Sequence, residues 1–292
     1  MNQQGGPKLT RREFGQAATA IVGAVLLEPR RTSAAASRSG LAFGVQLYMV
    51  RDRLKELEAT LHLIHQIGYS SVETFPMVYD RPAKELRSMI AANGLTVASG
   101  HFDYESLEER VDYAAELGLE YMVCPAIPVS QRTSVDGFHQ AAKHLNKAAI
   151  KAGSAGLKLG YHPHNYEYKP LGNETGFDIL MRELDSSVKL ELDIYWAIEG
   201  GQNPMEIMRR YRERLALIHI KDRKPANAFT FVPDEYAAHF TEAGAGTIDW
   251  KLLLGEARRL GVTQFFLDQD GSDLPIDQSL QINWNYLSRL TL

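Results

Sequence analysis

The chain is poor in several features that mark other classes of protein. It has one cysteine, Cys124, so it can form neither an internal disulfide nor a zinc site built on several thiolates. It has no long basic run, and its formal net charge is −4, which argues against nucleic acid and anionic membrane surfaces as partners. Any bound metal must therefore be held by His, Asp and Glu side chains.

The first forty residues do not read as part of a fold. Adjacent Arg11 and Arg12 precede Phe14, an apolar stretch runs through residues 17–27, and small residues follow at 34–36. That stretch is too short to cross a bilayer, which takes about 20 residues. The pattern predicts a secretory signal of the twin-arginine type over residues 1–36. Export to the periplasm or beyond, through the twin-arginine machinery, is the expectation, with a disordered Ala-rich tail as the alternative.

The rest of the chain, residues 41–292, repeats one unit of organisation. Five times a helix-like segment ends in glycine and an apolar strand follows, as expected where a left-handed residue ends a helix. The helical segments are amphipathic, and Ser106 with Glu109 reads as a capping box. The eight predicted strands are residues 41–48, 70–75, 95–101, 121–125, 157–162, 188–193, 215–221 and 262–268.

Strands that alternate with helices pair in parallel with right-handed crossovers. Eight such units in about 250 residues make one closed (β/α)8 barrel, a TIM barrel. The rival, an open doubly wound sheet, lacks the G-x-G-x-x-G motif after its first strand.

Polar residues stand at nearly every strand exit, where barrels of this kind carry their active sites. They are Gln46, Tyr48, Glu73, His101, His162, His164, Asp193, His219, Lys221, Asp268 and Asp270. Because side chains two apart share a face of a strand, Leu217, His219 and Lys221 point the same way. If Asp193 and Asp268 also face inward, two carboxylates and an imidazole converge, a set that suits Mn²⁺, Mg²⁺, Co²⁺ or Zn²⁺.

Six stretches, in order along the chain, resemble one known family. They are GVQLY at 44–48, GYHPHNYE at 160–167, LDIYW at 192–196, HIKD at 219–222, GAGTIDW at 244–250 and DQD at 268–270. The chain resembles the xylose isomerase-like TIM barrels, the sugar phosphate isomerase/epimerase group that also contains inosose dehydratase-like enzymes and a DNA-repair endonuclease. The resemblance covers nearly all of residues 41–292.

The resemblance implies one divalent metal held by residues from the last four strands. Asp193 and His219 match the family's Asp on strand six and His on strand seven. Asp268 stands where the family has Glu on strand eight. For the carboxylate of strand five we choose Glu167, with His162 as the competitor. The predicted metal ligands are therefore Glu167, Asp193, His219 and Asp268.

These residues predict a metal-dependent isomerase or epimerase that acts on a sugar or sugar-derived polyol through an enediolate. Proton transfer is assigned to four residues: His162, Glu167, Lys221 and Asp268. Substrate contacts are assigned to six: Gln46, Tyr48, Glu73, His101, His164 and Trp196. The segment 224–242 is expected to form a loop over the barrel mouth.

Other functions stay open at this point. The departures from the family pattern leave a lyase, dehydratase or hydrolase acting on a keto-sugar or keto-glycoside as one alternative. A barrel that binds carbohydrate without turning it over is another. A DNA-repair endonuclease is disfavoured by the acidic net charge and the export signal. The sequence leaves the sugar, the metal and a homo-oligomeric state undetermined.

Overall fold

A computed structural model describes residues 40–226, 229–231 and 239–292. The predicted export signal, residues 1–36, lies outside the described residues, as does part of the segment 224–242. Within the described part, no helix is both long and apolar enough to span a bilayer.

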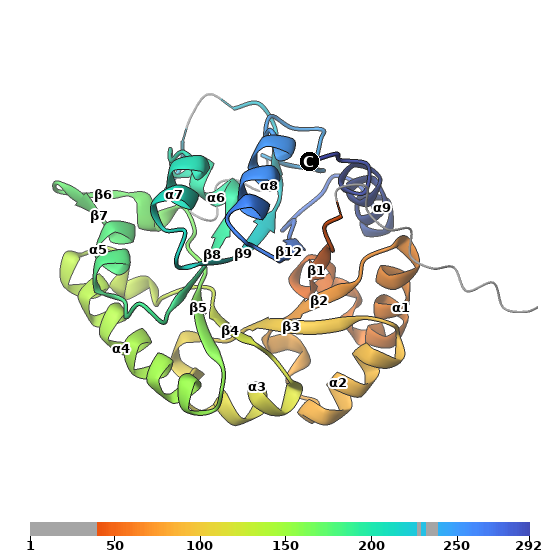
Figure 1. Cartoon of the computed structure of the whole chain (residues 1–292), viewed down its shortest axis with the longest axis horizontal. Coiled ribbons are helices and arrows are strands. Elements are labelled where there is room, and N and C mark those ends of the chain that lie inside the picture. Colours follow the sequence, from red (N-terminus) through yellow and green to blue (C-terminus); the bar gives the residue numbers. More distant parts are fainter. Residues whose placement is uncertain (1–39, 227–228, 232–238) are drawn as a thin grey trace, which may run out of the picture. The chain divides into compact units, whose positions relative to one another are not determined.

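Eight parallel strands close into a barrel, with helices around its outside (Figure 1). Going round the barrel, the strands follow the order β1-β12-β9-β8-β5-β4-β3-β2. Their bounds are β1 Gly44–Gln46, β2 Ser71–Thr74, β3 Thr96–His101, β4 Tyr121–Cys124, β5 Lys158–Tyr161, β8 Lys189–Asp193, β9 Leu215–Ile220 and β12 Gln264–Leu267. Each lies inside one of the eight ranges expected from the sequence, so the (β/α)8 barrel is confirmed.

Nine α-helices are found among the described residues. They are α1 Leu57–Ile67, α2 Ala83–Ala92, α3 Val111–Leu117, α4 Val135–Ser154, α5 Gly176–Glu183, α6 Ile194–Glu199, α7 Pro204–Arg210, α8 Trp250–Arg259 and α9 Ile276–Leu287. Short 3-10 helices cover Leu47–Glu56, Pro76–Val78, Tyr104–Ser106, Val129–Gln131 and Tyr166–Tyr168. Two small antiparallel pairs, β6 Pro170–Leu171 with β7 Glu174–Thr175 and β10 Asp222–Arg223 with β11 Phe240–Thr241, lie outside the barrel sheet.

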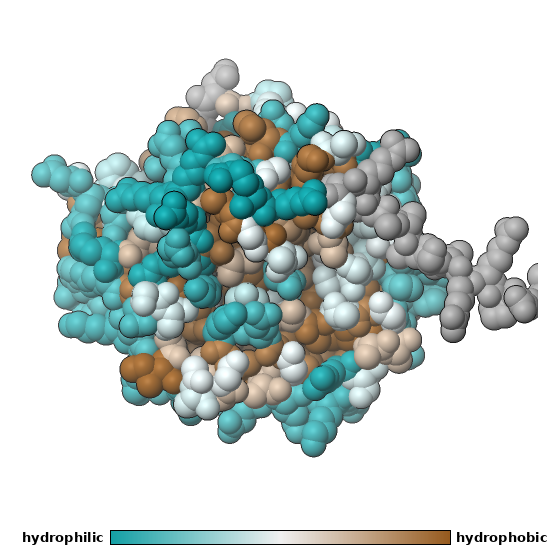
Figure 2. Space-filling model, in the orientation of Figure 1, coloured by the Kyte–Doolittle hydropathy of each residue, from teal (hydrophilic) through white to brown (hydrophobic). Residues whose placement is uncertain are grey.

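The helices bury one face each against the strands. In α1, Leu57, Thr60, Leu61 and Ile64 are buried, while Glu58, Ala59 and His62 are exposed. This is the 3.6-residue periodicity that the sequence showed. The periphery of the face in Figure 2 is accordingly mostly hydrophilic.

The glycine junctions behave as expected, but the capping box does not. Gly118 ends α3 with a φ of 86°, a left-handed conformation that favours glycine. The predicted capping box of Ser106 and Glu109 is wrong, because α3 begins only at Val111. The Ser106 hydroxyl instead donates to the carbonyl of Asp103, within the preceding turn.

The barrel interior changes from apolar to polar along the strands. Val123, Leu217 and Phe266 form a buried apolar cluster inside the barrel together with Tyr121. His219 follows two residues after Leu217 and therefore shares its face, as the alternation predicted. Its ring meets that of Phe266 edge-on, with centroids 6.2 Å apart. The apolar layer is thus the support on which the polar strand ends rest.

Candidate active site

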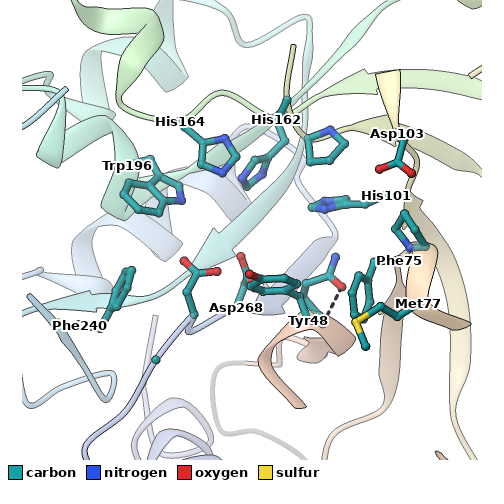
Figure 3. A pocket seen from close by; sticks show the side chains of 16 residues that line it. Tyr48, Phe75, Met77, His101, Asp103, His162, His164, Trp196, Phe240 and Asp268 are labelled. Atoms are coloured by element: carbon teal, nitrogen blue, oxygen red, sulfur yellow. Dashed lines mark hydrogen bonds between the residues drawn. The ribbon is translucent and has the colours of Figure 1, made fainter. Parts of the chain in front are cut away.

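A pocket of about 660 Å³ opens over the C-terminal ends of the barrel strands (Figure 3). That volume is within the usual range for small-molecule sites. Seven of the sequence-predicted site residues line it: Gln46, Tyr48, His101, His162, His164, Trp196 and Asp268. Four others, Glu73, Asp193, His219 and Lys221, are buried nearly completely at the strand ends.

Two sides of the pocket are apolar. Trp196 and Phe240 lie on one side, and Phe75 and Met77 lie on the other (Figure 3). Phe240 belongs to the segment 224–242 that was expected to cover the mouth, and its ring meets that of Trp196 edge-on. Between these walls a flat ring can lie against aromatic faces while its polar groups reach the floor.

Three imidazoles converge on one carboxylate below the pocket. We call His101, His162, Glu191 and His219 the inner cluster; each offers one ligand atom, and these atoms lie within 4.8 Å of one another. His101 Nε2 lies 2.7 Å from Glu191 Oε2, and His162 Nδ1 lies 3.1 Å from the same oxygen. His219 Nε2 lies 3.4 Å from Glu191 Oε1. The four residues come from, or directly follow, strands β3, β5, β8 and β9.

The electrostatics of the inner cluster differ between its members. Burial lowers the pKa of His162 to about 3, so this imidazole is neutral. Burial would also lower the pKa of His219, but Glu191 and Glu73 raise it well above its usual value. Burial would raise the pKa of Glu191, but His219 and His101 hold it well below its usual range.

Glu73 supports the cluster from β2. Its Oε2 accepts a hydrogen bond from Gln46 Nε2 and lies 2.7 Å from His219 Nε2. Its Oε1 accepts a hydrogen bond of 2.5 Å from the Ser99 hydroxyl. Burial and the neighbouring Glu191 raise the pKa of Glu73. Gln46 and Glu73, both predicted to touch substrate, thus serve at least in part to fix His219.

A second group shares His219 and adds two carboxylates. We call Asp193, His219 and Asp268 the outer cluster. His219 Nδ1 lies 3.1 Å from Asp268 Oδ2. The ammonium of Lys221 lies against this group, 2.9 Å from Asp268 Oδ2, 3.1 Å from Asp193 Oδ2 and 2.7 Å from Asp270 Oδ2. One buried ammonium therefore pairs with three carboxylates.

These charges set the protonation of the outer cluster. Burial would lower the pKa of Lys221, but Asp193, Asp268 and Asp270 hold it well above its usual value. Burial raises the pKa of Asp193 to about 6, against the opposing effect of Lys221. Burial would raise the pKa of Asp268 as well, but Lys221 and His219 hold it well below its usual range. Lys221 and Asp268 are consequently a charged pair at neutral pH.

Glu167, chosen from the sequence as a metal ligand and proton carrier, belongs to neither cluster. Its Oε1 accepts a short hydrogen bond from the Tyr161 hydroxyl, and its Oε2 accepts one of 3.0 Å from the backbone N–H of His164. Burial raises the pKa of Glu167 to about 7. The competitor, His162, lies nearer the outer group, with Nε2 4.0 Å from Asp193 Oδ2.

Buried polar atoms in both clusters fit a divalent cation. Glu191 Oε1, His162 Nδ1 and Asp268 Oδ1 are buried, yet make no well-aligned hydrogen bond within the described residues. Buried polar atoms of this kind are normally satisfied by a partner, an ordered water or an ion. Imidazole nitrogens and carboxylate oxygens are ligands that divalent metals accept.

Sequence reasoning missed Glu191 as a site residue, and it missed the pocket-lining Phe75, Met77 and Phe240. A signal for Glu191 was present, since it stands two residues before Asp193 and so shares its face of β8. Phe75, Met77 and Phe240 lie in or beside short elements outside the barrel sheet, where no periodicity marks them.

Comparisons with known proteins agree with this fold and site. A family model described as "Xylose isomerase-like TIM barrel" matches residues 61–267. The chain belongs to the xylose isomerase-like TIM barrel family. This family membership confirms the resemblance seen in the sequence, and it makes the chain a relative of enzymes.

Three relatives of this xylose isomerase-like chain illustrate the range. An inosose dehydratase of Clostridium botulinum is 25% identical over 229 residues, which cover 66% of this chain and 76% of that protein. A sugar phosphate isomerase/epimerase structure from Parabacteroides distasonis has a TM-score of 0.70 at 24% identity, covering 85% of this chain and 94% of the other. The structure of the IOLI protein "with a binding zinc atom" has a TM-score of 0.66 at 15% identity, covering 84% and 96%.

Proposed function

We propose that this protein is a metal-assisted enzyme that removes the proton next to a carbonyl group of a sugar-derived polyol and then expels water. The observation that carries the proposal is a combination of three features: a neutral imidazole, His164, lines the pocket; the Lys221 ammonium is buried against the lining residues Asp268 and Asp270; and two candidate metal clusters lie at the strand ends. The similarity to inosose dehydratases supports the same chemical class.

Lys221 is the group that we assign to the substrate oxygen. Its ammonium is buried and held charged by Asp193, Asp268 and Asp270. A fixed positive charge in a site that excludes water stabilises the oxyanion that forms when the neighbouring proton leaves. Asp268 positions this ammonium through the 2.9 Å contact, so its role is orientation rather than proton removal.

His164 is the group that we assign to the proton. It lines the pocket beside Trp196, with ring centroids 5.3 Å apart. Its Nδ1 is buried without a hydrogen-bond partner within the described residues. Burial holds the pKa of His164 well below its usual value, so the imidazole is neutral and one ring nitrogen carries a lone pair. Its backbone N–H is fixed by Glu167, which makes Glu167 a positioning residue.

The reaction balances with one acid/base group. The C–H bond breaks, its proton goes to His164, and its electron pair forms the enolate, whose oxyanion Lys221 stabilises. The enolate then restores the carbonyl as a new C=C bond forms and the neighbouring C–O bond breaks. The protonated imidazole returns the proton to the departing hydroxyl, which leaves as water. A divalent metal bound at the floor by either cluster would polarise the substrate carbonyl and lower the barrier to the first step.

We favour elimination over epimerisation because of the state of Asp268, the carboxylate that the resemblance offers as a second proton carrier. Epimerisation needs a second acceptor on the opposite face of the carbon. Asp268 stands where that acceptor would be, but its Oδ2 already faces Lys221 and His219, which hold its pKa low. Asp268 Oδ2 is therefore occupied in orienting Lys221 and His219.

Isomerisation remains the second candidate because it shares the first step, and the fold is also that of a sugar phosphate isomerase/epimerase. The two differ in mass balance. We would incubate the protein with keto-inositols, keto-sugars and keto-glycosides in deuterated water, and analyse products by mass spectrometry and NMR. Elimination would give a product that has lost one water molecule. Isomerisation would give a product with the atoms of the substrate, except that deuterium replaces a hydrogen on carbon. Hydrolysis or loss of an aglycone would release a second product.

Chelation and one variant test the assignment of groups. Dialysis against a chelator should abolish turnover, and added metal should restore it. His164→Ala should abolish turnover, whereas His62→Ala, at an exposed position on α1, should not. Saturable binding of a keto-sugar with neither turnover nor deuterium exchange would replace the enzyme by a carbohydrate-binding barrel.

From the sequence of residues 1–36 we also propose export by the twin-arginine route. Changing both Arg11 and Arg12 to Lys should retain the protein in the cytoplasm, while Arg30→Lys should not. Cell fractionation distinguishes the two outcomes, and cytoplasmic location of the unaltered protein would contradict the proposal.

A further inference from the structure

We propose that the divalent metal binds in the inner cluster, to His101, His162, Glu191 and His219, and that Lys221 is the cation of the outer cluster. This rests on the metal dependence in the proposed function but assigns different ligands from those expected by resemblance. It predicts a nitrogen-rich site, which selects Zn²⁺ or Co²⁺ over Mg²⁺ and Mn²⁺.

The first argument is the number and spacing of ligand atoms. A tetrahedral ion with bonds of the usual length separates its ligand atoms by about 3.4 Å. The contacts of Glu191 with His101, His162 and His219 measure 2.7, 3.1 and 3.4 Å. Small movements of side chains would therefore admit an ion between them, and the cluster supplies all four ligands without a residue from elsewhere.

The second argument is the arrangement of the three rings. The ring centroids of His101, His162 and His219 lie 5.2, 5.4 and 4.7 Å apart, so all three surround one point. All three imidazoles lie within 3.4 Å of Glu191, and Glu73 Oε2 lies close to two of them, 2.7 Å from His219 Nε2 and 3.3 Å from His101 Nε2. Two buried atoms, Glu191 Oε1 and His162 Nδ1, make no well-aligned hydrogen bond within the described residues. An ion would satisfy both.

The third argument comes from the outer cluster. Asp193 and Asp268 turn their Oδ2 atoms to the Lys221 ammonium, at 3.1 and 2.9 Å. A divalent ion bound to those same oxygens would face the ammonium at short range, and the repulsion would be large in this buried setting. Among the described residues the outer cluster brings three ligand atoms within 4.8 Å of one another, one fewer than the inner cluster. Glu167 does not add a fourth, because it bonds to Tyr161 and His164.

The ligands of the inner cluster have the supports that metal-bound histidines usually show. If His219 binds through Nε2, its Nδ1–H points to Asp268 Oδ2 at 3.1 Å. An imidazole that donates its other N–H to a carboxylate is fixed in tautomer and orientation. His101 and His162 also line the pocket, and Figure 3 shows them side by side, so substrate oxygen can approach the ion from the cavity.

The experiment measures metal, not turnover, so it is independent of whether the substrate is correctly identified. Untagged protein, stripped by chelator, is titrated with Co²⁺ and with Zn²⁺ in competition with a chromophoric chelator. The expected result is one ion per chain, a visible Co²⁺ spectrum typical of four-coordination, and no displacement by millimolar Mg²⁺.

Matched variants then separate the two clusters. His101→Ala should weaken Zn²⁺ binding by more than about 100-fold. Loss of a residue that only supports a metal ligand costs up to about 100-fold in affinity. Asp193→Asn should keep affinity within about tenfold, since Asp193 is not an inner ligand. His62→Ala controls for exposed histidines, and circular dichroism in chelator confirms that each variant is folded. His101→Gln, which keeps a polar side chain, replaces His101→Ala if the latter does not fold.

Three outcomes would overturn the inner site. One is strong binding that survives in both His101 variants. Another is binding lost in Asp193→Asn, which would move the ion to the outer cluster. The third is an unaltered protein that binds no Zn²⁺ or Co²⁺, which would make the three imidazoles a hydrogen-bonded core. Binding without turnover would leave the inner site standing and count only against the proposed reaction.

Discussion

The ammonium of Lys221 lies 2.9 Å from Asp268 Oδ2 although the lysine side chain is only 1% exposed. Such a charge is tolerated inside a protein only when it is paired and hydrogen-bonded. Asp193 and Asp270 complete the pairing. Three carboxylates around one ammonium fix its position. Without the ammonium, these buried carboxylates would lose the charge that compensates them.

Lys221→Met should therefore destabilise the fold as well as abolish turnover. Removing one partner of a buried ion pair costs about 3–5 kcal/mol, because the remaining charges lose their compensation. The loss of unfolding free energy should become smaller as the pH falls, since protonated carboxyl groups need no counter-charge. Urea unfolding measures it, with Lys158→Met as the control at an exposed pair with Glu120. Equal stability of Lys221→Met and the unaltered protein would contradict the arrangement.

Asp268 should be replaceable by Glu but not by Asn or Ala. Asp268 orients both Lys221 and His219 through its Oδ2, and loss of such a partner lowers activity by roughly 10- to 100-fold. Asp268→Glu keeps the charge and places it one methylene farther along. We expect kcat/KM to fall in Asp268→Asn and to recover partly in Asp268→Glu. Equal activities of the two variants would show that the carboxylate charge is not required.

The barrel could be predicted from the sequence because its signals are local. Glycine at five helix-to-strand junctions and the alternation of facing residues such as Leu217 and His219 do not depend on distant parts of the chain. The strand-end position of Asp193 and Asp268 follows from the same signals, whereas the family was indicated by the resemblance of the six stretches and is shown by the matching family model. These are the statements that the structure confirms.

Other features depend on geometry that the sequence does not fix. Glu191 is brought under the histidines by the register of β8 with β9, which shifts between Leu190 and Glu191. The carboxylate of Glu167 turns to Tyr161 within its own segment, a choice made by side-chain rotation and burial. The threefold pairing of Lys221 is likewise a tertiary arrangement. The role of Glu167 as a metal ligand, expected from the resemblance, stays a prediction. The metal content of Glu167→Ala, compared with that of His162→Ala, would test it.

Glu167 should make the protein less stable as the pH rises through the acid range. Its pKa is about 7 in the fold, because of burial, and about 4.3 when unfolded. The folded state therefore binds the proton more tightly, so stability falls between about pH 4.3 and 7 and then stays level. The full effect is on the order of 3 kcal/mol.

Glu167→Gln isolates this effect. The variant cannot ionise, so its unfolding free energy should lack that decline, whatever its absolute value. Urea unfolding at several pH values compares the slopes. Parallel curves for the two proteins between pH 4.3 and 7 would show that Glu167 is not protonated in the fold near neutrality.

Trp196 should contribute to substrate binding more than to the chemical step. Its indole lines the pocket opposite Phe75 and Met77, and it lies near His164 rather than among the ligand atoms of either cluster (Figure 3). An aromatic contact of this kind is worth up to about 1.5 kcal/mol. Trp196→Ala should therefore raise KM up to roughly tenfold with a small change in kcat, and Trp196→Phe should restore most of the binding.

Trp284→Phe is the matched control, because Trp284 packs against Tyr69 at α9, so it should alter stability without altering KM. A fall in kcat with an unchanged KM in Trp196→Ala would instead place the indole in the reaction itself.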